Sequence, residues 1–463
     1  MRGSSMIQFS LLATALVGGS AAAATLEVGP GKTYAAPCAA IAAAKSGDTI
    51  QIDAAGSYVG DVCGWTTSGL TIVGVNGRPK IDAGGTSAQG KAIWVISGDD
   101  TTVENVEMTG ATVTDANGAG IRQEGKNLTV RGCYFHDNQD GILAGDKPGS
   151  TIVIEGSEFA HNGAGDGQSH NLYINHVDKL VFRWNYSHQA NVGHLLKTRA
   201  LVSDIRYNRL SDEADGTASY EINVPNAGTT MIVGNVIEQG PMTMNSAIID
   251  YGSEPTGFNP TQDLYVVNNT IVNDRPAGGT FVQVAAMVTT PAILTNNIFV
   301  GGGTVSTQAA AVQTANYTGT TPMFAAPAMF DYHLLAGSPC VDAGQDPGMT
   351  SGGVSLAPLM EYVHPAMVEG RMSIGTIDIG AYELGGGVPL VDGGDATMDL
   401  AVPLGIDPID AGDGATGVGA HGCGCAVGAP SDQFTGRSGD QKFSFLLISL
   451  ISLLILRRQT KRA

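Results

Sequence analysis

The stretch VRGCYF (130–135) is followed by IEGSEF (154–159), FRWNYS (182–187) and IRYNRL (205–210), four versions of one short pattern. Further copies are VENVEM (103–108), VGNVI (233–237), VVNNTI (266–271) and LTNNIF (294–299). The fourth position of this register holds, in chain order, Val106, Cys133, Ser157, Asn185, Asn208, Asn235, Asn269 and Asn297. Steps of 23 to 34 residues between short alternating segments predict a solenoid, in which each repeat is one coil of strands and turns.

The successive asparagines at one register predict an asparagine ladder inside the solenoid. Each side-chain amide can donate to one neighbour and accept from the other across the spacing of about 4.8 Å between strands. Two positions after the ladder register, Phe135 and Phe159 are expected to stack in the core. Cys133 is then an inward residue, and we expect a buried thiol there.

The composition agrees with many short strands joined by tight turns. Glycine supplies 64 of the 463 residues, about twice its usual share, and charged residues make up only 14%. This composition argues against coiled coils and helical bundles, which need many charged and helix-forming residues. With 24 basic and 43 acidic residues the net charge is −19, which argues against general nucleic-acid binding.

The repeat resembles the right-handed parallel β-helix of the pectate-lyase-like superfamily over residues 25–384. VGPGKTYAAPCAAIAAAKSGDTIQI (28–52) is typical of the start of that fold, and HLLAGSPCVDAG (333–344) and IDIGAYE (377–383) resemble its last segments. The resemblance implies an all-β right-handed parallel β-helix solenoid with an N-terminal capping helix at 39–45. Cys38 and Cys63 flank that helix and are expected disulfide partners in an exported protein, whereas Cys340 has no assigned partner.

The first 24 residues have the composition of a targeting segment. Arg2 precedes an apolar stretch from Ile7 to Val17, and small residues lead to a cleavage point after Ala24. This arrangement predicts a secretory signal peptide. We therefore expect an exported protein.

The end of the chain has a second biased composition. A Gly- and Asp-rich segment at 385–441 predicts a flexible linker, and 442–463 combines an apolar helix with a basic tail. With Cys423 and Cys425 just upstream, the arrangement resembles the myxobacterial C-terminal sorting signal (MYXO-CTERM). That resemblance implies a sorting protease at the membrane and a location at the cell surface or outer membrane, or release after processing. A plain tail anchor is the alternative.

Polar residues concentrate in GAGDGQSHNLYINHV (163–177), NVGHLLKTRA (191–200) and GTASYEINVPNAG (216–228). His170 and His194 are 24 residues apart, and Tyr173, Lys197 and Glu221 follow one another at the same step. If the coils have that length, both sets stack as columns, and strand alternation turns the second set outward. The candidate catalytic residues are Lys197, Arg199, Tyr173 and His194. The candidate substrate-binding residues are His170, Glu221, Asn223, Arg122, Glu124 and Asn175.

Such a cluster suits β-elimination on a polyuronate, a linear acidic polysaccharide. Lys197 is the candidate base, if burial and the charge of Arg199 lower its pKa. Arg199 is the candidate partner of the substrate carboxylate, and Tyr173 or His194 the donor to the leaving oxygen. LLKTRA (195–200) also resembles the lysine-bearing strand of the alginate lyase and chondroitinase B family, whose lysine serves as base. SYEINVPN (219–226) stands where that family has a later arginine strand.

Other functions remain open at this point. A non-catalytic surface protein that binds glycan or acts as an adhesin needs only the ridged face and the anchor. A glycoside hydrolase needs two carboxylates on one face, which Glu221 could form with Asp166, Asp250 or Glu124. Exposed charges on adjacent strands also pair merely to stabilise a sheet.

No nucleotide-binding or other cofactor motif is present in the sequence. Calcium is a candidate ligand of the oxygen-rich turns SDEADG (211–216) and GDG (165–167), although neither is a complete calcium loop. We expect a monomer whose partners are a linear acidic polysaccharide and the sorting protease, with no nucleic acid.

Overall fold

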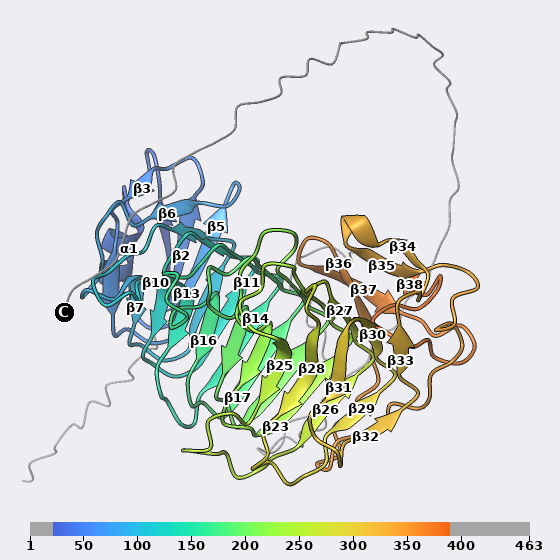
Figure 1. Cartoon of the computed structure of the whole chain (residues 1–463). Helices are drawn as coiled ribbons and strands as arrows, with labels where there is room; N and C mark the ends of the chain where they lie inside the picture. The colour runs from blue at the N-terminus through green and yellow to red at the C-terminus, as the bar shows by residue number, and fades with distance from the viewer. Residues whose placement is uncertain (1–21, 389–463) are drawn as a thin grey trace, which may run out of the picture. The chain divides into compact units, whose positions relative to one another are not determined.

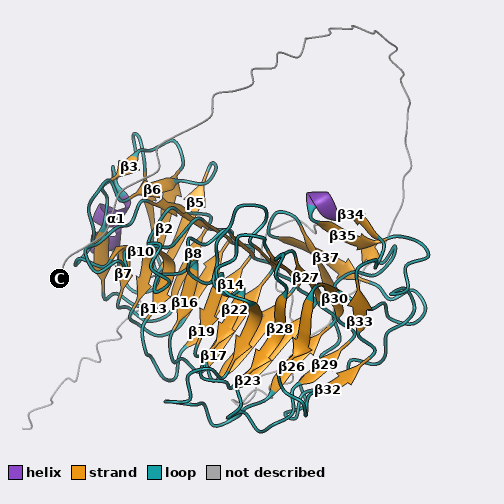
Figure 2. Ribbon diagram, viewed as in Figure 1, coloured by secondary structure: helices purple, strands orange, loops and turns teal. Residues whose placement is uncertain are grey.

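The computed structural model of the protein describes residues 22–388 (Figure 1). The predicted signal peptide up to residue 21, the linker beyond residue 388 and the tag with Cys423 and Cys425 lie outside the described residues. Within the described range, the coils of the chain stack on one another and form three long parallel sheets, which we call A, B and C (Figure 2). In each coil the chain passes from sheet A to sheet B and then to sheet C. This is the parallel β-helix that the repeat predicts.

Sheet A has 12 strands and contains the first half of each repeated segment. Its strands are β1 (Thr25–Val28), β2 (Thr49–Asp53), β5 (Thr71–Val75), β8 (Thr101–Glu104), β11 (Leu128–Arg131), β14 (Thr151–Glu155), β17 (Lys179–Arg183), β20 (Val202–Arg206), β23 (Thr229–Val233), β26 (Leu264–Val267), β29 (Ile293–Thr295) and β32 (Val312–Thr314). Alternate residues point inward: Ile50 and Ile52 on β2 and Ile72 on β5 are fully buried, while their neighbours are half-buried.

Sheet B has 11 strands and follows sheet A after a sharp corner. Its strands are β3 (Tyr58–Val59), β6 (Lys80–Asp82), β9 (Glu107–Thr109), β12 (Tyr134–His136), β15 (Glu158–Ala160), β18 (Tyr186–His188), β21 (Arg209–Ser211), β24 (Val236–Gln239), β27 (Thr270–Asn273), β30 (Ile298–Gly301) and β33 (Tyr317–Gly319). Phe135 and Phe159 stack in the core with ring centroids 5.1 Å apart, which confirms that prediction.

Sheet C has 10 strands and completes each coil. Its strands are β4 (Cys63–Trp65), β7 (Ala92–Ile96), β10 (Ala119–Gln123), β13 (Asp140–Ala144), β16 (Leu172–Ile174), β19 (Leu196–Thr198), β22 (Ile222–Val224), β25 (Ala247–Tyr251), β28 (Gly279–Val284) and β31 (Gly303–Ser306). The turns from B to C and from C to A vary in length from coil to coil, and they form the borders of the outer face of sheet C.

The asparagine ladder lies at the corner between sheets A and B. Asn185 donates to Asn208 at 3.1 Å, Asn208 to Asn235 at 2.9 Å, and Asn235 to Asn269 at 3.0 Å. The ladder continues through Asn297 to Asn316, one coil further than the sequence pattern predicts. The residue before several ladder positions has positive φ, as at Tyr207 (56°), so the corner is a tight left-handed turn.

The start of the solenoid carries the short helix α1 (Pro37–Ala43), which packs on β1, β2 and β4. It begins and ends two residues earlier than the predicted 39–45, and its buried residues are Pro37, Ala40 and Ile41. Cys38 and Cys63 form the expected disulfide beside it. Within residues 22–388, Cys133 and Cys340 are buried free thiols, and no helix is long and apolar enough to cross a membrane.

After β33 the chain leaves the coils and packs back along the A–B corner. It forms the antiparallel pair β34 (Phe324–Ala326) and β35 (Asp331–Leu334), with the 3-10 helix η1 (Pro327–Met329) between them, and then β36 (Met360–Val363), β37 (Met367–Arg371) and β38 (Gly387–Val388). Tyr207 accepts from the backbone of Leu359, and Asn268 donates to the carbonyl of Asp378. These contacts leave sheet C on the other side free for a site.

Candidate functional site

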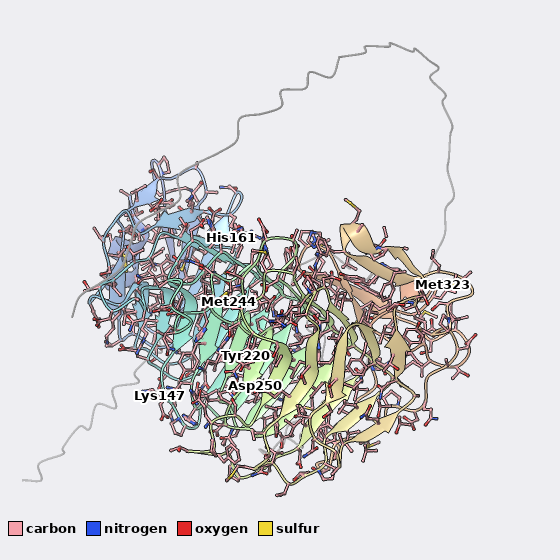
Figure 3. All side chains as sticks on the ribbon, in the orientation of Figure 1. Lys147, His161, Tyr220, Met244, Asp250 and Met323 are labelled. Carbon is pink, nitrogen blue, oxygen red and sulfur yellow. A yellow bond between two sulfur atoms is a disulfide. The ribbon has the colours of Figure 1, made fainter. Side chains whose placement is uncertain are left out.

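Sheet C presents a row of aligned side chains on the face away from the core. Strand pairing aligns, coil by coil, Val95, Arg122, Leu143, Tyr173, Lys197, Asn223, Asp250 and Gln283. Neighbouring strands lie about 4.8 Å apart, so a different chemical group stands at each step. Figure 3 labels Asp250 from this row and Tyr220 close to it.

Tyr173, Lys197, Arg199 and Glu254 form what we call the cation cluster. Arg199 Nε donates to the Tyr173 hydroxyl at 2.8 Å, and Lys197 Nζ lies 5.3 Å from the centroid of the Tyr173 ring. Glu254 bridges the two cations, with Oε2 2.7 Å from Arg199 Nη2 and Oε1 3.8 Å from Lys197 Nζ. Arg199 also donates to Asn226. The sequence prediction that Tyr173, Lys197 and Arg199 converge is therefore confirmed.

The two cations are largely buried, whereas the carboxylate that pairs with them is not. The side chains of Lys197 and Arg199 are each 13% exposed, and that of Glu254 is 48% exposed. Burial, followed by the positive charge of Arg199, lowers the pKa of Lys197 despite the opposing charges of Glu254 and Asp250. A lysine with a lowered pKa has a larger neutral fraction and can accept a proton.

His170 and His194 stack as predicted, with ring centroids 4.4 Å apart. Both are buried, at 1% and 6% exposure, and His170 Nδ1 accepts the backbone N–H of His194 at 3.0 Å. Burial lowers the pKa of His194 to about 3 and that of His170 well below its usual value. Because a neutral imidazole has no readily transferred proton, His194 does not suit the acid role predicted for it, and buried His170 is not placed to hold substrate.

The prediction that Glu221 extends the column of Tyr173 and Lys197 is wrong. Asn223 pairs with Lys197, because the turn over residues 212–221 is longer than the matching turn over 189–195 and moves the register by two residues. Glu221 is fully buried, its carboxyl oxygens have no hydrogen-bond partner within the described residues, and burial raises its pKa well above the usual value. It can neither contact substrate nor form the predicted carboxylate pair of a hydrolase.

Asn223 occupies the next step of the row but is 3% exposed. It donates to Asp250 Oδ2 at 2.7 Å, and Gln283 donates to Asp250 Oδ1 at 2.8 Å. Ser253 also donates to Asp250, from the same loop that supplies Glu254. These contacts make Asn223 and Asp250 a support for the cation cluster rather than a free substrate-binding surface.

On the other side of the cation cluster, the predicted flanking residues border a cleft of about 290 Å³. Arg122, Asn175 and Tyr173 line it, together with Asp140, Leu143 and Gln168 and the turn residues Asp115, Ala116 and Asn117. Glu124 lies beside this cleft, paired with Lys91 Nζ at 2.5 Å. We call this cavity the amide-lined cleft.

Two site residues escaped the sequence pattern. Glu254 lies in the 252–263 loop, an insertion between sheets C and A that has no counterpart in the shorter coils. Asp140 aligns with His170, but the long 161–171 turn places them 30 residues apart, outside the 24-residue step. The signal that could find Glu254 is an acidic residue within an unusually long turn, whereas Asp140 has no such signal beside it in the sequence.

The two candidate calcium turns hold Asp166 and Asp212 in hydrogen bonds within the fold. No three His, Cys, Asp or Glu side chains between residues 22 and 388 gather as ligands for a metal ion. In the GDG turn, Asp166 Oδ1 accepts hydrogen bonds from Gln168 and Ser169, and in the SDEADG turn Asp212 is fully buried. These carboxylates serve their own turns.

Known proteins match this chain in its fold. A family model described as a right-handed β-helix region matches residues 58–237. The crystal structure of the pectate lyase Pel9A superposes with a TM-score of 0.52, covering 79% of this chain and 98% of that one at 15% sequence identity. No curated protein matches the sequence. The sheet topology and these comparisons together show that the chain is a right-handed parallel β-helix.

Proposed function

We propose that this protein acts on polysaccharide, as a polyuronate lyase that cleaves by β-elimination at the cation cluster. The observation that carries this proposal is the position of Glu254, whose two oxygens face Lys197 and Arg199. A carboxylate in that position has its charge neutralised by an arginine while it lies against a lysine with a lowered pKa. A uronate carboxylate in the place of Glu254 would put its α-proton near the lysine.

The chemistry then divides among three side chains. Neutral Lys197 takes the proton from C5 of the uronate, and the electron pair forms the C4–C5 double bond as the C4–O bond breaks. Arg199 stabilises the charge that develops on the carboxylate. The Tyr173 hydroxyl, which accepts from Arg199 Nε at 2.8 Å, donates its own proton to the departing oxygen. Lys197 then releases its proton to solvent, and Tyr173 takes one back from solvent, which restores both side chains.

The pectate lyase among the similar structures supports a polysaccharide substrate at the level of the fold. A non-catalytic glycan-binding surface protein is the second candidate. It is favoured by the ion pairs that already satisfy Lys197 and Arg199, since such pairs can simply stabilise a sheet face.

We also propose export and surface retention. The sequence of residues 1–24 and the resemblance of the last 44 residues to a sorting signal support this location, and the Cys38–Cys63 disulfide suits an oxidising compartment. Fractionation of cells, with and without the last 44 residues of the chain, tests it. A full-length protein found in the cytoplasm would contradict the proposal.

The lyase activity is tested with the full chain and a panel of polygalacturonate, alginate and hyaluronan. We expect ultraviolet absorbance from unsaturated chain ends with at least one polymer, in buffers with calcium or with a chelator. If no polymer gives absorbance in either buffer, but one of the polymers slows the protein in affinity electrophoresis, the protein is a glycan-binding protein and the lyase proposal is wrong.

A further inference from the structure

The amide-lined cleft adjoins the cation cluster without being part of it. Tyr173 belongs to both, since it lines the cleft and accepts from Arg199. The floor is apolar, because Leu143 and the Tyr173 ring pack with Val95 and Ala119 on this face of sheet C. The walls are polar, with Asn117, Gln168 and Asn175 among the lining residues. A sugar ring has this same combination of apolar faces and polar edges.

Arg122 supplies positive charge to the cleft, and its hydrogen-bonding capacity is not used up. Its Nε is buried yet donates to no acceptor within the described part of the chain. The carboxylate nearest to it in an ion pair is Glu124, at 3.8 Å, and the Glu124 Oε1 atom already binds Lys91 at 2.5 Å. The Arg122 side chain is still 27% exposed and lines the cleft, so the accessible part of its guanidinium can bind an anionic ligand there.

Asp140 lies in the same cleft but does not cancel the charge of Arg122. Its carboxyl is 1% exposed, and burial raises its pKa well above the usual value even though Arg122 opposes the shift. Its Oδ1 accepts the backbone N–H of His170 at 2.8 Å. Burial therefore disfavours the charged form of Asp140, which reduces its opposition to an anion beside Arg122. The exposed Asp115 lies at the rim.

The register places Arg122 three strands from Lys197 in the aligned row. Three steps of the strand spacing amount to about 14 Å. A linear polyuronate presents one carboxylate per sugar ring, and its rings repeat at a distance comparable to one strand step. The two cationic positions thus match carboxylates on sugars a few residues apart in one extended chain.

We propose that the amide-lined cleft is a second uronate subsite, in which Arg122 binds the carboxylate of a sugar remote from the cleaved bond. This inference rests on the proposed function for the identity of the polymer. It adds that the protein requires an oligomer long enough to reach from the cation cluster to Arg122.

Binding to defined oligomers tests the subsite separately from catalysis. Calorimetry would use the full chain in a Lys197→Ala background, with dimers and hexamers of galacturonate, of mannuronate and of hyaluronan. Arg122→Gln should weaken binding of a hexamer at least tenfold and binding of its dimer less than threefold. Arg131→Gln removes the same charge from the outer face of sheet A and is the matched control. It should leave the dissociation constants of the hexamer and the dimer within twofold of those of its parent. Gln168→Ala, an exposed change in the same cleft, replaces Arg122→Gln if that variant fails to fold.

The outcomes separate this inference from the lyase proposal. If Arg122→Gln binds the hexamer as tightly as its parent, or if no hexamer binds the parent, the subsite is wrong even when the wild-type chain cleaves polymer. If Arg122→Gln weakens hexamer binding while no polymer yields unsaturated ends, the subsite stands and the lyase function falls.

Discussion

The A–B corner and the outer face of sheet C arise from the same coils but repeat in opposite ways. At the corner, one residue type returns at one register, and each of Asn185, Asn208 and Asn235 makes the same bonds as the next. On sheet C, the register is kept while the residue changes, from Arg122 through Tyr173 to Lys197. A position that repeats its residue serves the fold, whereas a position that keeps the register and varies the residue is available for chemistry.

The largest expected effect comes from the sheet C row. Lys197→Ala and Lys197→Arg should each lower kcat/KM about a thousandfold, or roughly 4 kcal/mol, because neither side chain can accept a proton at neutral pH. Steady-state rates of double-bond formation measure this. Lys179→Ala on sheet A is the matched control and should keep its activity. Loss of activity in the control, or its retention in Lys197→Arg, would contradict the assignment of the base.

The next effect comes from the corner. Asn208→Ala should lower the free energy of unfolding by about 3–5 kcal/mol, because it leaves the backbone N–H of Asn185 and the carbonyl of Phe182 buried without partners. The denaturation midpoint measures the loss. Asn191→Ala, at an exposed turn position, should stay within about 0.5 kcal/mol. Equal midpoints for the two variants would show that the ladder does not stabilise the fold.

The difference between the two regions also explains what the sequence could predict. The ladder could be found because one residue type recurs, and the alignment of Tyr173 with Lys197 because the coil between them keeps the 24-residue step. Glu221 was misplaced because turn length moves the register without leaving a sign in the strands. Turns therefore set the limits of register arguments in a solenoid.

Burial was the second property that the sequence could not supply. Alternation predicts which side of a strand faces the core, but it did not predict that Asn223 on β22 and His170 in the long 161–171 loop are both buried. Glu254 reaches the site from such a loop, and its partners could not be inferred from a repeat. The cleft with Asp140 likewise depends on loops that differ between coils.

The interior next to the site gives a pH-dependent test of the fold. Burial raises the pKa of Glu238 to about 8 and of Asp212 to about 6, above the values of 4.5 and 3.8 expected when unfolded. The folded protein binds these two protons more tightly than the unfolded chain does. The stability that this tighter binding contributes is complete below the unfolded pKa values and is lost as the pH rises through the folded pKa values.

The wild-type free energy of unfolding should therefore fall between pH 5 and pH 8, by roughly 3–4 kcal/mol from Glu238 alone. Glu238→Gln keeps the acceptor for Ser211 and should remove the part of the fall that Glu238 contributes, leaving the parts from Asp212 and Glu221. Asp215→Asn, an exposed change in the turn that contains Asp212, should leave the slope intact. An unchanged slope in Glu238→Gln would mean that Glu238 is ionised in the folded protein.

The smallest expected effect separates a carboxylate that competes with substrate from one that builds the site. Glu254→Gln should lower KM three- to tenfold, roughly 1 kcal/mol, because the substrate carboxylate no longer displaces an internal one from Arg199. The charge of Glu254 raises the pKa of Lys197 in the free enzyme, so its removal should also shift the acidic limb of the kcat/KM profile to lower pH. Glu104→Gln, on sheet A, should change neither quantity. If KM rises instead, Glu254 holds Arg199 in the position that binds substrate. The side chains on the outer face of sheet C would then need fixed internal partners, as the asparagines at the A–B corner do.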